Sequence, residues 1–389
     1  MDGKTTMKRY NNIYKTITNI DEIIDMYENT ISKNTRNKLK IEKFDRMYSL
    51  NIAEIKKQLS AKSYIPGKYN IFLIREPKLR IIMSQEIKDK IVNHLVAKYF
   101  LIDIFDKSLI KENCATRIGM GTHYALKLFK NNYNKYKNKY KKFYILKFDI
   151  SKYFYNIDHE IAKQIIRSKI KDEDALKIIF SIIDSTDELY VNDTINKLKK
   201  TEIERLKQLD IHDKNIKIEE VEKLPTYQKG KGLPIGNMSS QIIATFYLNE
   251  LDHYIKEKLK IKGYVRYMDD GVIIHDNKEY LKYVKLEIEK IVNKYKLKLN
   301  KKTKIYSSNE EIEFLGFRFF KKNKKTISKV TNKTKKRFKK KVKKLYKYNE
   351  ILSEEKRSVI ASYLGHLGYG CCNELIYKNI KLKDRWYIV

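Results

Sequence analysis

The feature that most constrains the fold is a pair of adjacent carboxylates, Asp269 and Asp270, between two short apolar runs. Residues 264–267 precede the pair and residues 272–275 follow it, and both runs have the composition of β-strands. Two strands joined by so short a segment form a hairpin, so we expect the carboxylates at its tip. Strands separated by helical segments, with acidic residues at strand ends or turns, indicate an α+β sheet domain.

A third carboxylate, Asp149, directly follows residues 144–148, which are apolar except for Lys147. Nucleotidyl transfer by two metal ions needs carboxylates that hold two Mg²⁺ ions about 3.5–4 Å apart. One ion activates the primer 3′-hydroxyl, and the other neutralises the leaving pyrophosphate. Carboxylates from two neighbouring strands can converge on such a pair of ions. Two Asp residues in a turn are also ordinary turn chemistry, so the pattern needs its context.

The rest of the chain alternates helical segments with short strands. Helical periodicity is found at residues 10–60, 86–100 and 238–259. Two short strands are expected at 71–74 and 79–82, around the turn-forming Glu76-Pro77. Residues 193–222 are polar and highly charged, which is typical of a surface excursion.

The charge of the chain narrows the class of partner. There are 84 Lys and Arg residues against 48 Asp and Glu residues, which gives a formal net charge of +36. Such an excess is usually neutralised by a polyanion, either nucleic acid or an anionic membrane surface. No apolar run reaches the length of about eighteen residues needed to span a bilayer, and no secretory signal is visible. The three Cys residues show neither metal spacing nor a disulfide framework, which fits a reducing cytoplasm.

A basic segment near the end of the chain accounts for much of this excess. Residues 321–347 contain fifteen Lys and Arg residues and no acidic residue. Five lysines there follow helical spacing: Lys339, Lys340, Lys343, Lys344 and Lys347. An apolar stripe is formed by Phe338, Val342 and Leu345. One side of such a helix can pack on protein while the other follows a phosphate backbone, although a solvated helix face has the same pattern.

Seven short motifs occur in a fixed order along the chain. They are Lys78-Leu79-Arg80-Ile81-Ile82, Gly119-Met120-Gly121-Thr122-His123, Phe148-Asp149-Ile150-Ser151-Lys152-Tyr153-Phe154, Gly232-Leu233-Pro234-Ile235-Gly236-Asn237-Met238-Ser239-Ser240-Gln241, Tyr267-Met268-Asp269-Asp270, Lys302-Thr303 and Phe314-Leu315-Gly316-Phe317. In this order and at these spacings, the chain from about residue 70 to 320 resembles the reverse transcriptases.

The resemblance implies an α+β right-hand polymerase. Such a protein has fingers, a palm built on an antiparallel sheet with helices, and a helical thumb. The division expected here is an N-terminal helical extension over 1–60, fingers over 61–143, a palm over 144–320 with fingers elements and a charged insertion near 193–222, and a basic helical thumb over 321–389.

The resemblance also assigns the catalytic centre. Asp149 and Asp269 resemble the two metal-bridging carboxylates, and Asp270 resembles the acid beside them. The backbone carbonyl of Ile150 is implied to complete the shell of two Mg²⁺ ions, for which Mn²⁺ can substitute. Phe154 stands at the position of an aromatic steric gate, whose ring would clash with a ribose 2′-hydroxyl and so select deoxynucleotides.

Other motifs are implied to bind the nucleotide. Lys78 and Arg80 alternate on a predicted strand, so both point to one face, where paired cations can hold the incoming triphosphate. The Gly-rich loop that contains Ile235 and Gly236 lets the backbone approach the nascent base pair. Gln241 is expected to open the helix behind this loop.

Two further motifs are implied to hold the primer and template. The turn Phe314-Leu315-Gly316 resembles the primer grip, where backbone positions the primer end. The basic helix with its five lysines comes directly after it and resembles the thumb. Phosphate contacts from such lysines are independent of base sequence and strongly dependent on salt.

The fourth motif points to a subgroup. The chain is most similar to the bacterial group II intron-like branch, and in particular to the enzymes of diversity-generating retroelements. Most enzymes of the branch carry Gln-Gly and then Ser-Pro there, whereas that subgroup carries an aliphatic residue before the Gly and Ser-Gln after it. This chain has Ile235-Gly236 and Ser240-Gln241. The aliphatic residue is associated with low fidelity in the subgroup, and some defence-associated bacterial reverse transcriptases share parts of the pattern.

The implied function is RNA-directed DNA polymerisation, in which template RNA and a primer yield cDNA from dNTPs, with errors if the enzyme serves a diversity-generating retroelement. Two alternatives stay open. One is a defence-associated reverse transcriptase that makes repetitive or untemplated DNA, and the other is a polymerase-derived RNA-binding scaffold or maturase. A small basic accessory protein or other operon partners are implied, without a membrane. The expected location is the cytoplasm, with a bacterial or phage gene.

Overall fold

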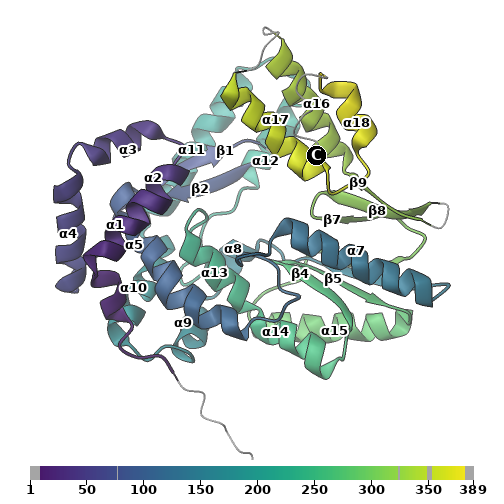
Figure 1. Ribbon diagram of the computed structural model, residues 1–389, viewed down its shortest axis with the longest axis horizontal. Coiled ribbons are helices and arrows are strands. Elements are labelled where there is room, and N and C mark those ends of the chain that lie inside the picture. The colour runs from purple at the N-terminus through teal and green to yellow at the C-terminus, as the bar shows by residue number, and fades with distance from the viewer. Residues whose placement is uncertain (1–8, 77, 323–324, 348–352, 382–389) are drawn as a thin grey trace, which may run out of the picture. The chain divides into compact units, whose positions relative to one another are not determined.

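The computed structural model describes residues 9–76, 78–322, 325–347 and 353–381 (Figure 1). The chain forms two compact units, and each is assembled from three segments. The first unit comprises Met1–Lys111, Ile150–His253 and Glu289–Leu299. The second unit comprises Glu112–Asp149, Tyr254–Ile288 and Asn300–Val389. The division into extension, fingers, palm and thumb stays a prediction.

The first unit begins with helices, as the periodicity of residues 10–60 predicts. They are η1 (Tyr14–Thr18), α1 (Ile20–Asp25), η2 (Met26–Ile31), α2 (Ser32–Asn34), α3 (Lys38–Asp45) and α4 (Tyr48–Ser60). Asn19 and Asn37 cap α1 and α3, because each side chain accepts a hydrogen bond from a backbone N–H of the first turn. The helices bury Ile17, Ile23 and Leu59 completely.

A two-stranded antiparallel sheet follows these helices. β1 (Asn70–Ile74) pairs with β2 (Arg80–Ser84), and Ile71 lies opposite Met83. The two predicted strands are therefore confirmed. The expectation that Lys78 and Arg80 share one strand is wrong, because the connection extends to residue 79 and Lys78 lies in a bend before β2. Pro77, which we expected at the turn, lies outside the described residues.

The charged stretch over 193–222 is helical. It contains most of α11 (Leu189–Lys207) and all of α12 (Lys214–Glu222). Val191 and Ile195 of α11 join the apolar core under the β1–β2 sheet. Glu202 is buried and pairs with Arg75 and Arg205. The stretch is therefore packed on the sheet along one side and is not simply a surface excursion.

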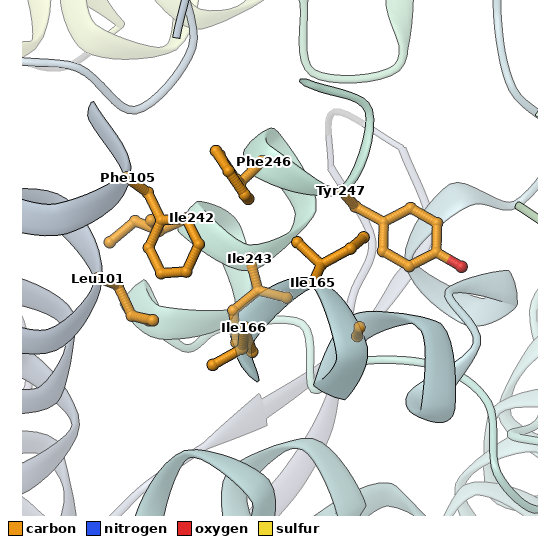
Figure 2. Close-up of a pocket in the computed structure, with 9 residues that line it drawn as sticks. Leu101, Phe105, Ile165, Ile166, Ile242, Ile243, Phe246 and Tyr247 are labelled. Carbon is orange, nitrogen blue, oxygen red and sulfur yellow. The ribbon is translucent and has the colours of Figure 1, made fainter. Parts of the chain in front are cut away.

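The core of the first unit lies where several helices meet α13 (Met238–Tyr247). Contributing helices are α5 (Ile87–Leu95), η3 (Val96–Ile102), α6 (Asp103–Phe105) and α9 (His159–Arg167). α10 (Glu173–Asp184) packs on η3 and α9. Figure 2 shows the small pocket in this core, where Ile242 and Phe246 lie near Leu101, Phe105 and other hydrocarbon side chains. Because the lining is almost entirely apolar, the pocket belongs to the core and offers no chemistry.

The predicted helix over 238–259 is interrupted. α13 ends at Tyr247, and the chain continues as α14 (Asn249–His253) and the π-helical η6 (Tyr254–Lys258). The predicted helix over 86–100 likewise consists of α5 and the π-helical η3. Apolar periodicity cannot distinguish an uninterrupted helix from one with such local changes of pitch.

The second unit is built on a four-stranded antiparallel sheet in the order β4-β5-β3-β6. The strands are β3 (Tyr144–Phe148), β4 (Gly263–Tyr267), β5 (Asp270–His275) and β6 (Lys304–Ser307). Three of them confirm the strands predicted at 144–148, 264–267 and 272–275. α7 (Thr122–Lys139) packs along β4 and β5 (Figure 1), and α15 (Lys278–Lys294) follows β5 in the chain.

A second antiparallel sheet in this unit consists of β7 (Ile312–Phe314), β8 (Phe317–Lys322) and β9 (Lys325–Val330). Phe129 of α7 packs against Phe314 and Phe319, with ring centroids 5.4 and 4.7 Å apart. Three helices, α16 (Asn332–Tyr346), α17 (Glu354–Leu367) and α18 (Asn373–Asn379), pack on one another after β9. No helix in the described residues has the length and apolar character needed to cross a membrane.

Candidate active site

Three carboxylates meet at one edge of the four-stranded sheet. β3 pairs with β5 so that Phe148 lies opposite Gly271, which puts Asp149 and Asp270 next in the same register. Asp269 lies in the two-residue turn between β4 and β5, because Tyr267 pairs with Asp270. The hairpin and the strand end predicted from the sequence therefore bring the carboxylate triad (Asp149, Asp269 and Asp270) together.

The turn that carries Asp269 has an unusual backbone. Met268 has φ of +57°, in the left-handed region that favours Gly, so the turn is strained. Arg266, which is completely buried, donates a 2.5 Å hydrogen bond from Nη1 to the Met268 carbonyl oxygen. This bond holds the backbone of the turn in place. Sequence reasoning missed Arg266, although a charged residue inside an apolar strand was a usable signal.

The triad is held in a state of mutual repulsion. Burial and the charge of Asp149 raise the pKa of Asp269 well above its usual value. Burial raises the pKa of Asp270 to about 6, with Asp149 adding to the effect and Lys147 opposing it. Like charges in a partly desolvated site oppose ionisation, and a cation among them relieves that cost.

Lys147 is the second residue that sequence reasoning left without a role. Its Nζ lies 3.7 Å from Oδ2 of Asp270 and donates a 2.7 Å hydrogen bond to the carbonyl oxygen of Glu313 in β7. The side chain therefore connects the triad to the second sheet of the same unit. The signal was visible, since Lys147 is the one charged residue in an otherwise apolar strand.

Asn300 is the third such residue, and it orients Asp149. Its side-chain amide donates a 3.0 Å hydrogen bond to Oδ2 of Asp149, and its backbone N–H donates one of 2.7 Å to the Asp149 carbonyl oxygen. The N–H of Asp149 in turn donates to the Thr303 hydroxyl, at 3.5 Å. These contacts fix both the backbone and the side chain of Asp149 from one short segment before β6.

The donor set of the triad fits a hard divalent cation. All its side-chain donors are carboxylate oxygens, which are the ligands that Mg²⁺ and Mn²⁺ prefer. Oδ1 of Asp270 is buried and has no hydrogen-bond partner among the described residues, so it is an acceptor that a cation would satisfy. Ile150 follows Asp149 directly in the chain but belongs to the first unit, and its metal contact stays a prediction.

The Gly-rich loop (residues 230–236) lies in the first unit, bound to strand β2. The N–H of Met83 donates a 2.8 Å hydrogen bond to the carbonyl oxygen of Ile235. Gly236 has φ of +136°, and a Cβ there would lie 2.5 Å from the Met83 carbonyl oxygen. Only Gly permits this approach. The loop therefore joins the strand on which Arg80 lies.

Three more predicted nucleotide-binding residues lie in the same unit. Phe154 is part of α8 (Tyr153–Asn156), and its carbonyl oxygen accepts a 2.8 Å hydrogen bond from the N–H of Leu233 in the Gly-rich loop. Gln241 lies one turn inside α13, which begins at Met238, so the expectation that it opens the helix is wrong. Lys78 is exposed in its bend.

The predicted primer grip is a tight hairpin turn in the second unit. Phe314 pairs with Phe317, which leaves Leu315 and Gly316 as the two turn residues. Both have positive φ, +47° and +83°, as a type I′ turn requires. Phe314 is completely buried, whereas the turn itself is partly exposed. The site therefore presents backbone at the tip of a well-anchored hairpin.

The basic helix α16 has the two faces that its spacing predicts. Phe338, Val342 and Leu345 are buried. The five predicted contact residues are all exposed: Lys339, Lys340, Lys343, Lys344 and Lys347. Lys347 follows the last residue of the helix, Tyr346. The exposed row carries a dense positive charge, and its contact with nucleic acid stays a prediction.

Comparisons with known proteins identify a family for most of the chain. The model of a family described as reverse transcriptase (RNA-dependent DNA polymerase) matches residues 68–319, which is more than half of the 389 residues. No curated protein matches the chain. A similar solved structure is that of apo telomerase from Candida tropicalis, truncated from the C-terminal domain. It is 13% identical, with a TM-score of 0.41, and the match covers 67% of this chain and 54% of that chain. The chain thus spans about half the length of that telomerase.

Proposed function

Because this chain belongs to the reverse transcriptase family, we propose that it copies an RNA template into cDNA with the carboxylate triad as its metal-binding centre. The enzyme is an RNA-directed DNA polymerase with an α+β right-hand polymerase fold. The observation that carries the assignment of the centre is the convergence of three carboxylates on paired strands, with the pKa values of two of them raised. A scaffold that only binds RNA has no physical need for this repulsion.

Each member of the centre has a proposed part. Asp149 and Asp269 would hold the two cations, with Asp270 as the neighbouring acid and the Ile150 carbonyl as a further ligand. When bound, two Mg²⁺ ions, or Mn²⁺ in their place, supply activation of the primer 3′-hydroxyl and neutralisation of the pyrophosphate. Asn300 keeps the Asp149 carboxylate in one orientation through its 3.0 Å hydrogen bond.

The incoming dNTP is proposed to bind against the first unit. Lys78 and Arg80 hold the triphosphate, and the Phe154 ring excludes the ribose 2′-hydroxyl. Ile235 and Gly236 contact the nascent base pair, with Gln241 behind them. Hydrogen bonds from Met83 to Ile235 and from Leu233 to Phe154 support a common site, because they connect β2, the Gly-rich loop and α8.

The template and primer are proposed to contact the second unit. The backbone of the turn at Leu315 and Gly316, anchored by Phe314, holds the primer end. The exposed lysines of α16 and Lys347 contact phosphates of the template and primer. These lysines place part of the net charge of +36 on one face of a single helix and at its end.

We propose that the copying is error-prone, as in diversity-generating retroelements, with a small basic accessory protein or another operon product as partner. An aliphatic side chain at Ile235 removes a polar contact to the template or nucleotide. Sequencing of cDNA from a template with all four bases should show errors concentrated at adenines. Ile235→Gln should reduce them, whereas the aliphatic control Ile235→Val should not.

Two results would overturn this finer proposal. An unchanged error rate opposite adenine in the Ile235→Gln enzyme would show that the side chain of Ile235 does not determine fidelity. Repetitive or untemplated DNA made in cells with the neighbouring genes present would favour a defence role instead.

A further inference from the structure

A buried histidine of the first unit contacts the Gly-rich loop. His159 begins α9 and has 1% of its surface exposed. Its Nε2 lies 2.7 Å from the carbonyl oxygen of Gly232. Because a carbonyl oxygen only accepts hydrogen bonds, Nε2 carries a proton. The other ring nitrogen, Nδ1, lies 3.2 Å from Oδ1 of Asp184 and 3.4 Å from Oδ2 of Asp187.

A proton on Nδ1 fits the space between Nδ1 and the two carboxylates better than a metal ion does. Within the described part of the chain, His159, Asp184 and Asp187 are the group whose ligand atoms all lie within 4.8 Å, a spacing that would also suit a metal ion. However, Nζ of Lys163 lies 2.8 Å from the same Asp184 oxygen and would repel a metal ion there. An imidazolium satisfies both carboxylates, and its Nδ1–H, placed between two oxygens, points directly at neither.

The histidine fixes one end of the loop. The Gly232 carbonyl also accepts a 3.0 Å hydrogen bond from the Thr186 hydroxyl, and the Gly232 N–H donates one of 2.8 Å to Ile157. Gly230 is held on both sides, because its N–H donates to Oδ1 of Asp187 at 2.9 Å and its carbonyl accepts from the His159 N–H at 3.0 Å. The other end of the loop is bound to β2.

We propose that His159 is a positioning residue, which bridges Gly232 to Asp184 and Asp187 and so holds the Gly-rich loop in its nucleotide-binding conformation. The inference rests on the proposed role of this loop in binding the incoming dNTP. It adds a residue outside the seven motifs to the set that shapes the nucleotide site.

The bridge has a defined pH dependence. Burial lowers the pKa of His159, but the nearby Asp184 carboxylate, the hydrogen bond to Gly232 and the charge of Asp187 raise that pKa more, so it lies above its usual value. The charged groups around it are Asp184, Asp187 and Lys163. The preceding residue, Asp158, forms an ion pair with Lys296, and its backbone forms a β-bridge with Lys231. A raised pKa means that the bridge stabilises the loop fully at low pH and loses this effect as pH rises through the folded-state pKa.

The test measures the loop directly. Hydrogen exchange at the Gly230, Gly232 and Leu233 amides, expressed relative to intrinsic rates, needs no catalysis. His159→Gln keeps an N–H donor for Gly232 and removes the charge, and the exposed His212→Gln is the matched control. Asp187→Asn provides a second variant, because its amide oxygen can still accept from Gly230.

We expect the wild type and His212→Gln to be protected at about pH 6 and to lose protection as pH rises. His159→Gln and Asp187→Asn should lack most of this dependence. In primer extension, His159→Gln should raise the KM for dNTP about tenfold at low pH with little change in kcat.

Equal protection in the wild type, His159→Gln and Asp187→Asn at every pH would overturn the proposal. So would protection that is lost on chelation of divalent cations and restored by Zn²⁺, since the site would then hold a metal. Absence of polymerase activity in every variant would contradict the proposed function alone, because the exchange result stands without it.

Discussion

At the scale of single residues, the carboxylate triad combines burial with mutual repulsion. The pKa values of Asp269 and Asp270 are both raised, by burial first and by Asp149 in addition. A carboxyl whose folded-state pKa is raised stabilises the fold while it is protonated, and this contribution is lost as pH rises through the folded-state pKa. At neutral pH the ionised carboxylates therefore lower the free energy of unfolding of the metal-free protein, and cation binding removes this destabilisation.

This destabilisation predicts how the Tm responds to Mg²⁺. Added Mg²⁺ should raise the Tm more at about pH 8 than at about pH 5.5, because protonated carboxyls bind the cation poorly. Asp269→Asn should have a higher metal-free Tm than the wild type at pH 8 and a smaller Mg²⁺ response. Differential scanning fluorimetry measures both. An equal Mg²⁺ response in both proteins at both pH values would show that the triad is not the binding site.

Lys147 provides a second prediction at this scale. Because Lys147 lowers the pKa of Asp270, Lys147→Met should raise that pKa further. Nucleotide incorporation at about pH 7 should fall about tenfold and recover in part at about pH 8.5. The matched control is Lys304→Met, since Lys304 lies opposite Lys147 on β6 and pairs with Glu310. Identical pH profiles for the two variants would contradict a role for Lys147.

At the scale of elements, the Gly-rich loop depends on a close approach of backbone to backbone. Gly236→Ala would place Cβ 2.5 Å from the Met83 carbonyl oxygen at a φ of +136°. We expect a destabilisation of about 1–3 kcal/mol and a higher KM for dNTP. Gly365 lies in α17 with no heavy atom within 4 Å of its Cβ position, so Gly365→Ala should be neutral or stabilising. Chemical denaturation and primer extension compare the two, and equal effects would refute the steric argument.

The sequence predicts the strands of this fold well, but it predicts neither the breaks in its helices nor its long-range contacts. The strands 144–148, 264–267 and 272–275 follow from local apolar patterns, and the structure confirms them. The breaks after Tyr247, and the bend that holds Lys78, depend on packing that no local pattern records. The contact between Asn300 and Asp149 joins residues 151 positions apart, so it follows only from the pairing of β6 with β3.

At the scale of the whole molecule, the net charge of +36 predicts salt-dependent binding of template and primer. Replacement of the five exposed basic-helix lysines by Gln should weaken binding and lower the slope of log affinity against log salt by up to about 4. The replaced residues are Lys339, Lys340, Lys343, Lys344 and Lys347. A control with five other exposed lysines uses Lys56, Lys57, Lys200, Lys207 and Lys223. Fluorescence anisotropy over a salt series measures the slopes. Equal slopes for the two variants would show that the lysines of the basic helix contribute no more to binding than lysines elsewhere on the surface.

We propose that the carboxylate triad is the catalytic centre of an RNA-directed DNA polymerase, and primer extension on an RNA template tests this role. With Mg²⁺ and dNTPs, the wild type should extend a DNA primer, and a chelator should abolish the reaction. Asp269→Asn should reduce incorporation at least about a hundredfold, because the developing charge then lacks its metal. Asp276→Asn, at an exposed residue just after β5, should leave it unchanged. Equal extension by the wild type and Asp269→Asn would contradict the proposed role of the triad.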